Sequence, residues 1–306
     1  MLQPLSTLPF LKTGDTICLV SPAFYASEQD ILSGIKVLES WGLQVIAAPG
    51  IFDRWGSFAG SDEVRMSDLQ WALDHPYARA ILCIRGGYGI SRILPGLNWD
   101  KFQENPKWLT GFSDITLLHQ KIQQLGFPSL HALMAARYGS PDFAESSRFM
   151  REFFFGKKKE ISYPVLNHDW RPGNISGLLW GGNLSMVSHS IGSGLESGRE
   201  DLILFLEEVG EAYYRIDRLL RQIVRVETLM KRVRAVVLGQ FTDCAQKEFP
   251  EEIPAMAAQA FSGLPVFSGL PSGHGNPNFP LVLGFPAHLK KQGGEWQFSQ
   301  SLGSDA

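Results

Sequence analysis

The chain has 306 residues, a length that fits about two domains and is enough to bury a substantial core. Hydrophobic residues make up 44% and charged residues 19%, with a formal net charge of −3, which excludes a disordered polyelectrolyte and a strongly basic nucleic-acid binder. No apolar run approaches the ~20 residues of a membrane helix, and the N-terminus lacks the basic region and apolar core of a signal peptide. We therefore expect a cytoplasmic α/β enzyme with no nucleic-acid or membrane partner.

The first half of the chain alternates strand-like and helix-like segments. Short apolar runs predict strands, and apolar residues spaced three or four apart predict helices. The predicted strands span 16–20, 43–48, 80–84 and 108–112, and the predicted helices span 27–41, 62–74 and 115–125. Such alternation with short connections predicts a parallel sheet covered by helices on both faces.

The composition changes near residue 160. The basic run Lys157–Lys159 has no interleaved aromatic residues and predicts a solvated helix end. The stretch 161–173 is rich in Pro, Asn and Asp, which predicts a linker between an N-terminal domain (1–160) and a smaller, mixed, β-rich C-terminal domain (174–306). In this second domain we expect strands at 202–206, 235–238 and 281–283, and helices at 184–191, 213–225 and 253–261.

Ser113 lies in the sequence TGFSD at a predicted junction of strand and helix. A nucleophile elbow needs a small residue before the serine because the backbone turns sharply there. Gly111 stands two positions before Ser113, but Asp114 follows the serine and no glycine stands at position 115. The GxSxG pattern is incomplete, so a helix N-cap made by Ser113 or Asp114 is the alternative.

A glycine-rich segment, RGGYG (85–89), directly follows the predicted strand 80–84. Glycines at a strand end let the backbone approach a ligand and point its N–H groups at it. The phosphate-binding patterns GxGxxG and GxxxxGK[ST] are absent, so the segment suits half of an oxyanion hole or a packed turn. Ligands bind outside the carboxyl ends of parallel strands, and this loop and Ser113 could thus face one crevice.

An acid and a histidine complete the candidate set. Glu207 ends an apolar strand, where a carboxylate needs a partner, and Glu208 and Glu211 are the neighbouring alternatives. His274 stands between glycines in SGHGN, which predicts an exposed loop position. A serine hydroxyl becomes reactive when a histidine takes its proton and an acid orients that histidine, so Ser113, Glu207 and His274 form a candidate triad.

The sequence gives no support for a metal centre or a disulfide framework. It contains no HExxH motif and no cluster of His and Cys. Its three cysteines are widely spaced and form no CxxC pair. We therefore predict a reaction without a metal or another cofactor.

Several segments together resemble one family. IRGGYGISRILPGLNWD, GFSDITLLH, LLWGGNLSM, LFLEEVGEAYYRIDRLL and SGHGN are similar to the LD-carboxypeptidase family of serine peptidases, and the resemblance covers nearly the whole chain. The family includes muramoyl-tetrapeptide carboxypeptidases and the immunity peptidases that inactivate microcin C. The resemblance implies an N-terminal domain similar to class I glutamine amidotransferases, a β-rich C-terminal domain, an active site between the two, and a homodimer.

The resemblance also implies roles for the candidate residues. Ser113 is the expected nucleophile, Glu207 the acid and His274 the base. The expected oxyanion donors are the backbone N–H groups of Gly86, Gly87 and Asp114. Tyr88 and Arg85 are expected to contact the substrate. The Arg85 guanidinium could pair with a terminal carboxylate, or it could instead anchor the glycine loop through backbone carbonyls or Asp114.

The implied reaction is hydrolysis of the L,D-peptide bond before a terminal D-alanine in a cytoplasmic muropeptide, through an acyl-enzyme, in murein recycling. One alternative is a microcin-immunity peptidase that cleaves peptidyl-adenylate analogues, with Trp180 or Trp55 as a platform for the base. The other is a non-catalytic protein that holds a peptide or an anion at the glycine loop.

Overall fold

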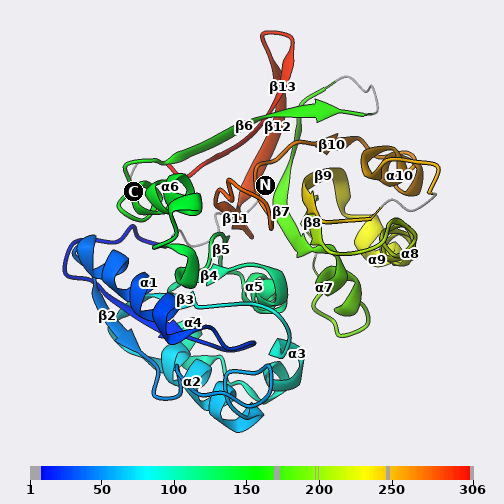
Figure 1. Cartoon of the computed structure of the whole chain (residues 1–306). Coiled ribbons are helices and arrows are strands. Elements are labelled where there is room, and N and C mark those ends of the chain that lie inside the picture. The colour runs from blue at the N-terminus through cyan, green and yellow to red at the C-terminus, as the bar shows by residue number, and fades with distance from the viewer. Residues whose placement is uncertain (1–7, 169–172, 197, 199, 246–248, 304–306) are drawn as a thin grey trace.

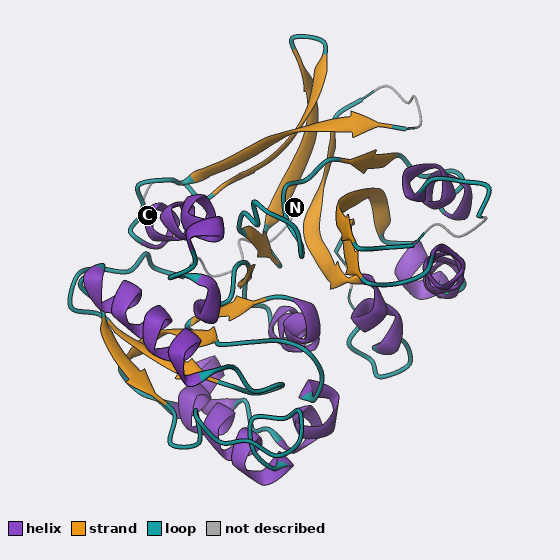
Figure 2. Ribbon diagram, viewed as in Figure 1, coloured by secondary structure: helices purple, strands orange, loops and turns teal. Residues whose placement is uncertain are grey.

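Two β structures, an open sheet and a closed barrel, organise the chain (Figure 1). The structure is a computed structural model that describes residues 8–168, 173–196, 198, 200–245 and 249–303. The sheet with its helices forms the lower left of the view, and the barrel lies above and to the right of it (Figure 2). This arrangement confirms the expectation of a parallel-rich α/β part followed by a β-rich part, whereas the likeness to glutamine amidotransferases stays a prediction.

The open sheet has the strand order β11-β5-β4-β3-β1-β2. Its strands are β1 (Thr16–Val20), β2 (Gln44–Ala47), β3 (Ala78–Cys83), β4 (Trp108–Gly111), β5 (Ser129–His131) and β11 (Leu281–Leu283). The first five run parallel, as predicted, and β11 joins the edge antiparallel to β5. The strand expected at 281–283 therefore exists, but it completes the sheet of the first half.

Helices cover both faces of this sheet. They are α1 (Glu28–Ser40), α2 (Asp62–Asp74), α3 (Ile90–Ile93), α4 (Asp100–Glu104), α5 (Thr116–Gln124) and α6 (Ala144–Phe154), with short 3-10 turns η1 (Leu94–Gly96), η2 (Ser113–Ile115), η3 (Ala135–Arg137) and η4 (Pro141–Phe143). Alternate residues of β1 point to opposite faces: Ile17 and Leu19 pack with α1 and α6, whereas Cys18 and Val20 pack with α2 to α5. The predicted helices at 27–41, 62–74 and 115–125 agree with α1, α2 and α5 to within a residue.

The barrel closes in the order β10-β6-β13-β12-β7-β8-β9. Its strands are β6 (Glu160–Asn167), β7 (Ile175–Asn183), β8 (Leu202–Val209), β9 (Val233–Thr242), β10 (Val266–Ser268), β12 (Pro286–Gln292) and β13 (Glu295–Ser301). Outside it lie α7 (Leu184–His189), α8 (Tyr213–Val224), α9 (Glu227–Met230) and α10 (Ile253–Ala260). Strands β7 to β10 are parallel neighbours, and the others pair antiparallel.

Part of the predicted linker is a strand. Residues 161–167 belong to β6, where Ile161, Tyr163 and Val165 are buried and the residues between them are exposed. This alternation is typical of a strand with one face on the core. Residues 169–172 of the predicted linker lie outside the described residues, and the domain limits at 160 and 174 stay predictions. The largest apolar cluster runs through both β structures, so the two parts share a core.

The basic run Lys157–Lys159 follows the end of α6, close to the predicted helix end. Its side chains are not simply solvated: the Lys158 ammonium lies 3.8 Å from the ring centroid of Phe149, and that of Lys159 lies 5.6 Å from the ring of Phe10. These lysines cover aromatic side chains of the core edge. Among the described residues, no helix combines the length and the apolar character that a membrane crossing requires.

Candidate active site

Ser113 stands at a sharp turn between β4 and α5. Its φ of +62° lies in the left-handed region, which is strained for a residue other than glycine and is often found at functional sites. The turn needs Gly111, because a Cβ there would lie 2.9 Å from Ile115 Cγ1 and 3.2 Å from Cys83 Cβ. The incomplete GxSxG pattern thus forms an elbow, and no side chain caps η2 or α5, contrary to the helix-cap alternative.

The glycine loop after β3 lies against this elbow. A Cβ on Gly86 would lie 3.2 Å from Ser113 Oγ and 2.9 Å from Met134 Cε, so the backbone of Gly86 directly borders the serine. Gly87 has a φ of +110°, and a Cβ there would overlap Phe24. Phe24 in turn donates its N–H to the Gly86 carbonyl at 3.1 Å. The carboxyl ends of β3 and β4 therefore meet, as the sequence predicts.

Two buried charged side chains hold the far end of this loop. Asp114 accepts the Ile90 N–H at 2.9 Å, and Arg65 donates from Nη1 to the Gly89 carbonyl at 3.2 Å and to the Pro22 carbonyl at 2.8 Å. Burial raises the pKa of Asp114 to about 6, although the Ile90 N–H and Arg65 oppose the rise. The sequence analysis missed Arg65, since an arginine within a helix rich in charged residues gives no signal of burial.

The predicted acid and base are bonded to each other. His274 Nδ1 donates to Glu207 Oε2 at 2.7 Å, and the Glu207 side chain is fully buried while that of His274 is 18% exposed. Strand alternation places Glu207 on the same side of β8 as Phe205, toward the open sheet. Burial alone raises the pKa of Glu207, but His274 and His131 outweigh it and lower this pKa to about 2.

The neighbouring glutamates have other partners. Glu208 accepts hydrogen bonds from Asn183 Nδ2 at 2.8 Å, from the Ser185 N–H at 2.8 Å and from the Ser185 hydroxyl at 2.6 Å. Glu211 forms an ion pair with Arg215 at 3.4 Å on the first turn of α8. Consecutive side chains of β8 point to opposite sides, which separates Glu207 from Glu208, and Glu211 lies beyond the end of β8. Of the three glutamates that the residues alone leave open, Glu207 is the one bonded to His274.

The loop that carries His274 is fixed by polar contacts with β9. Gln240 accepts the Gly275 N–H at 2.8 Å, donates to the Pro277 carbonyl at 2.8 Å, and gives its own N–H to the Ser272 carbonyl at 3.0 Å. His274 is therefore held on an ordered loop and is only partly exposed. Its position differs in this respect from the exposed loop position that the flanking glycines predict.

Phe112 links the serine elbow to His274. The Phe112 ring lies 4.7 Å from the His274 ring, centroid to centroid, and Phe112 directly precedes the serine. Within the described part of the chain, Ser113 Oγ forms no hydrogen bond. With Nδ1 bound to Glu207, Nε2 is the ring nitrogen left to take a proton. The structure thus bonds acid to base and sets this pair beside the elbow.

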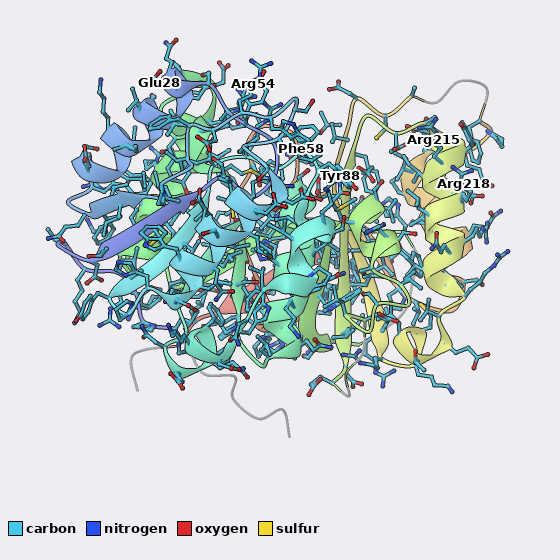
Figure 3. All side chains as sticks on the ribbon, turned by 90° about the horizontal axis from the view of Figure 1, so that it is seen from below. Glu28, Arg54, Phe58, Tyr88, Arg215 and Arg218 are labelled. Carbon is cyan, nitrogen blue, oxygen red and sulfur yellow. The ribbon has the colours of Figure 1, made fainter. Side chains whose placement is uncertain are left out.

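The two candidate substrate contacts, Arg85 and Tyr88, are exposed on the glycine loop. Arg85 Nη1 donates to the Tyr25 carbonyl at 2.8 Å, so one end of its guanidinium anchors the neighbouring loop. Tyr88 is 44% exposed, and its ring lies 5.9 Å from that of Phe58. Figure 3 shows Tyr88 and Phe58 together on the N-terminal half, with Arg215 on α8 in the other half.

His131, which the sequence analysis did not identify, also lies beside the candidate acid. It ends β5, is fully buried, and places Nε2 3.9 Å from Glu207 Oε1. Its ring packs 5.0 Å from Phe205 and 5.7 Å from Phe112, and its Nδ1 lies 3.2 Å from the Ser272 hydroxyl. A lone histidine at the end of a three-residue strand gave no sequence signal.

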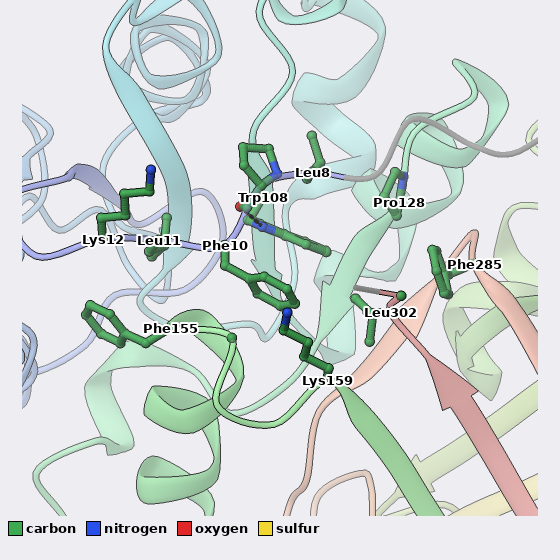
Figure 4. Close-up of a pocket in the computed structure, with 13 residues that line it drawn as sticks. Leu8, Phe10, Leu11, Lys12, Trp108, Pro128, Phe155, Lys159, Phe285 and Leu302 are labelled. Carbon is green, nitrogen blue, oxygen red and sulfur yellow. Dashed lines mark hydrogen bonds between the residues drawn. The ribbon is translucent and has the colours of Figure 1, made fainter. Parts of the chain in front are cut away.

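Two further features bear on the chemistry of the chain. Among the described residues, no group of three or more His, Cys, Asp or Glu side chains is arranged to hold a metal ion. A pocket of about 650 Å³ opens beside Trp108, at the opposite end of β4 from the elbow (Figure 4). The described residues that line it include Lys12 and Lys159 but no serine, histidine or carboxylate, so it lacks the groups of a hydrolytic site.

Comparisons with known proteins agree over both halves. The LD-carboxypeptidase N-terminal domain matches residues 17–132, and the LD-carboxypeptidase C-terminal domain matches residues 176–289. A murein tetrapeptide carboxypeptidase from Pseudomonas aeruginosa is 31% identical over 96% of this chain and 99% of its own length. The structure of a muramoyltetrapeptide carboxypeptidase from Oxalobacter formigenes aligns with a TM-score of 0.82 at 28% identity, covering 93% of this chain and 98% of that one. MccF in complex with glutamyl sulfamoyl guanosine shares the fold, with a TM-score of 0.84 at 18% identity over 97% of this chain and 98% of that one.

Proposed function

The chain belongs to the LD-carboxypeptidase family, and from that premise we propose that it is a serine carboxypeptidase that removes the terminal D-alanine of a muropeptide. One observation carries the proposal: a strained serine elbow beside a bonded pair of buried glutamate and histidine. The murein tetrapeptide carboxypeptidase of P. aeruginosa supports the substrate class.

In the proposed reaction, Ser113 Oγ attacks the carbonyl carbon of the L,D-peptide bond. His274 Nε2 takes the serine proton, and Glu207 holds the ring in the tautomer that leaves Nε2 free. Backbone N–H groups of Gly86, Gly87 and Asp114 face the developing oxyanion, where fixed donors stabilise the transition state more than the ground state.

The tetrahedral intermediate then collapses. His274 gives its proton to the amine of D-alanine, which leaves, and the acyl group stays on the serine. A water molecule activated by the same histidine hydrolyses this ester and restores Ser113. The hydrogen bond between Ser113 and His274 forms when substrate is bound, since catalytic bonds of a free enzyme often tighten only in the complex.

The direct test is to incubate the pure protein with a murein tetrapeptide and to detect released D-alanine by mass spectrometry. A peptidyl sulfamoyl-adenylate in a parallel reaction tests the microcin-immunity alternative. Of the two tryptophans considered for that alternative, Trp180 is buried at 4% exposure and cannot offer a face to a base, whereas Trp55 is 56% exposed. A protein that only binds its ligand would release neither product, and its Ser113 would not react with a fluorophosphonate.

The charge of Glu207 sets the expected pH dependence. Burial opposes the charged form of His274, but the adjacent Glu207 carboxylate outweighs burial and raises the pKa of His274 above its ordinary value of 6.5. Since the base must be neutral in the free enzyme, activity is lost as the pH falls through this raised pKa. We expect kcat/KM for D-alanine release, measured from about pH 5 to about pH 9, to show an acid limb above 6.5. An acid limb at or below 6.5 would contradict the pairing.

Arg85 is expected to anchor the loop, because its Nη1 already bonds the Tyr25 carbonyl. The change Arg85→Lys removes the guanidinium that donates to the Tyr25 carbonyl. It should therefore slow cleavage of the tetrapeptide and of its C-terminal amide by the same factor. The kinetics of both substrates measure this directly. A mutant that loses most of its preference for the free acid would instead show that Arg85 binds the terminal carboxylate.

A cytoplasmic location, expected from the sequence, and a homodimer, implied by the resemblance, stay predictions. A cytoplasmic enzyme of this kind would trim imported muropeptides before reuse. Sedimentation analysis of the pure protein measures the oligomeric state.

A further inference from the structure

We propose that His131 is a positioning residue for the acid of the triad, a second histidine that holds Oε1 of Glu207 while His274 occupies Oε2. The inference rests on the proposed role of Glu207. It goes beyond that role because it assigns a histidine from the sheet of the nucleophile to the acid of the barrel.

The first argument is that two buried polar atoms face each other. His131 Nε2 and Glu207 Oε1 lie 3.9 Å apart on fully buried side chains, and neither atom has a hydrogen-bond partner among the described residues. Because an unpaired buried polar atom is costly, each of these atoms needs the other.

The second argument concerns the ring proton of His131. The Ser272 hydroxyl lies 3.2 Å from Nδ1 and can donate to it, an arrangement in which the ring carries a proton on Nε2. That proton then points at the Glu207 carboxylate. Ser272 stands two residues before His274, so His131 contacts both the acid and the loop that carries the base.

The surroundings of His131 leave the carboxylate as its partner. The Phe205 and Phe112 rings pack against it, and the titratable groups that face it are Glu207 from β8 and His119 from α5, the latter 6.4 Å away ring to ring. His119 bonds the Gly111 carbonyl at 2.9 Å and the Ser129 hydroxyl at 2.8 Å. Burial lowers the pKa of His119 to about 3, so this ring is neutral and adds no charge.

A donor on Oε1 changes how tightly the acid and base hold a proton between them. Without it, the Glu207 carboxylate concentrates its charge on His274 and the pair binds its proton more strongly. With this donor in place, part of the Glu207 charge is neutralised on the side away from His274. His274 then loses its proton, and becomes able to act as a base, at a lower pH. His131 therefore tunes the pH range in which the triad works.

The test compares His131→Phe, which keeps a ring but removes the donor, with His131→Gln, which restores an N–H donor near the place of Nε2. We measure kcat/KM for D-alanine release against pH and, in parallel, the pH dependence of Ser113 labelling by a fluorophosphonate. His131→Phe should lower kcat by about tenfold or more with little change in KM, and should move the acid limb up by about half a pH unit or more. His131→Gln should recover most of both losses.

His119→Phe is the matched control, because it removes a buried histidine of the same sheet region that does not touch Glu207. It should reduce stability and leave the acid limb in place. A limb that stays in place in His131→Phe, or a Gln variant that recovers nothing, overturns the proposal. If His131→Phe fails to fold, Ser272→Ala is used in its place, because it removes the contact that orients the His131 ring. An acid limb that stays at the wild-type pH in Ser272→Ala would then overturn the proposal.

The two hypotheses fail separately. If the wild-type protein labels at Ser113 but releases no D-alanine, the proposed substrate is wrong, while the pH dependence of labelling still tests His131.

Discussion

Replacing Ser113 with alanine is expected to lower kcat for D-alanine release by about 10⁴-fold or more, because the nucleophile is lost and only binding and the oxyanion donors remain. The fold should survive, since Ser113 Oγ makes no hydrogen bond within the described residues and alanine tolerates the φ of +62° about as well as serine. Release of D-alanine by mass spectrometry and circular dichroism of the pure variant measure the two effects. Labelling by a fluorophosphonate should disappear in the same variant.

A metal chelator provides the control for this prediction. If a chelator abolished activity while Ser113→Ala retained it, the serine mechanism would be wrong. A variant that lost activity together with its circular dichroism signal would call for Ser113→Cys, which keeps a nucleophile at the same turn and should remain reactive toward thiol reagents.

The change Glu207→Gln is expected to lower kcat by about 10³- to 10⁴-fold. An amide of the same shape carries no charge and can turn its NH₂ group toward His274 Nδ1, which favours the tautomer with its proton on Nε2. That tautomer cannot accept the serine proton. The acid limb of kcat/KM should also move down, since the carboxylate that raises the pKa of His274 is gone. Both parameters come from D-alanine release measured across pH.

Glu208→Gln is the matched control, because it is the next residue of β8 and also a buried carboxylate. Its partners are Asn183 and Ser185, so the change should affect the unfolding temperature more than kcat. Equal losses of kcat in the two variants would mean that Glu207 acts through the stability of β8 rather than through His274.

The sequence predicts the elements of the sheet well because their patterns are strong. The apolar run 16–20 and the helices predicted at 27–41 and 62–74 have clear periodicity, and their ends agree with the structure to within a residue. In the structure, Ser27 and Ser61 cap the N-termini of these two helices. Strand β6 was missed because Pro164 and Asn167 are typical of loops, although Ile161, Tyr163 and Val165 alternate as in a strand.

The candidate triad was predicted from residue type and local sequence pattern alone. Ser113 stands after an apolar strand and His274 between glycines, whereas Glu207, expected at the end of a strand, lies within β8. Arg65 and His131 were not predictable, because what matters about them is burial against backbone carbonyls or a carboxylate that lies far away in the sequence. Contacts of this kind depend on how the strands and helices are arranged in space. The periodicity of one sequence does not predict that arrangement.

The antiparallel edge strand β11 has a consequence for how the protein is made. Once residue 160 has been translated, every parallel strand of the open sheet has been synthesised, yet the outer edge of β5 gains its partner only when Leu281–Leu283 follows. An uncovered strand edge is a template for pairing with another chain. The nascent first half is therefore at risk of aggregation for more than a hundred further residues of synthesis, and at ~5–20 residues per second this interval lasts several seconds. The segment that ends this risk follows the loop that carries His274, so the chain gains its candidate base and closes its sheet at nearly the same point of synthesis.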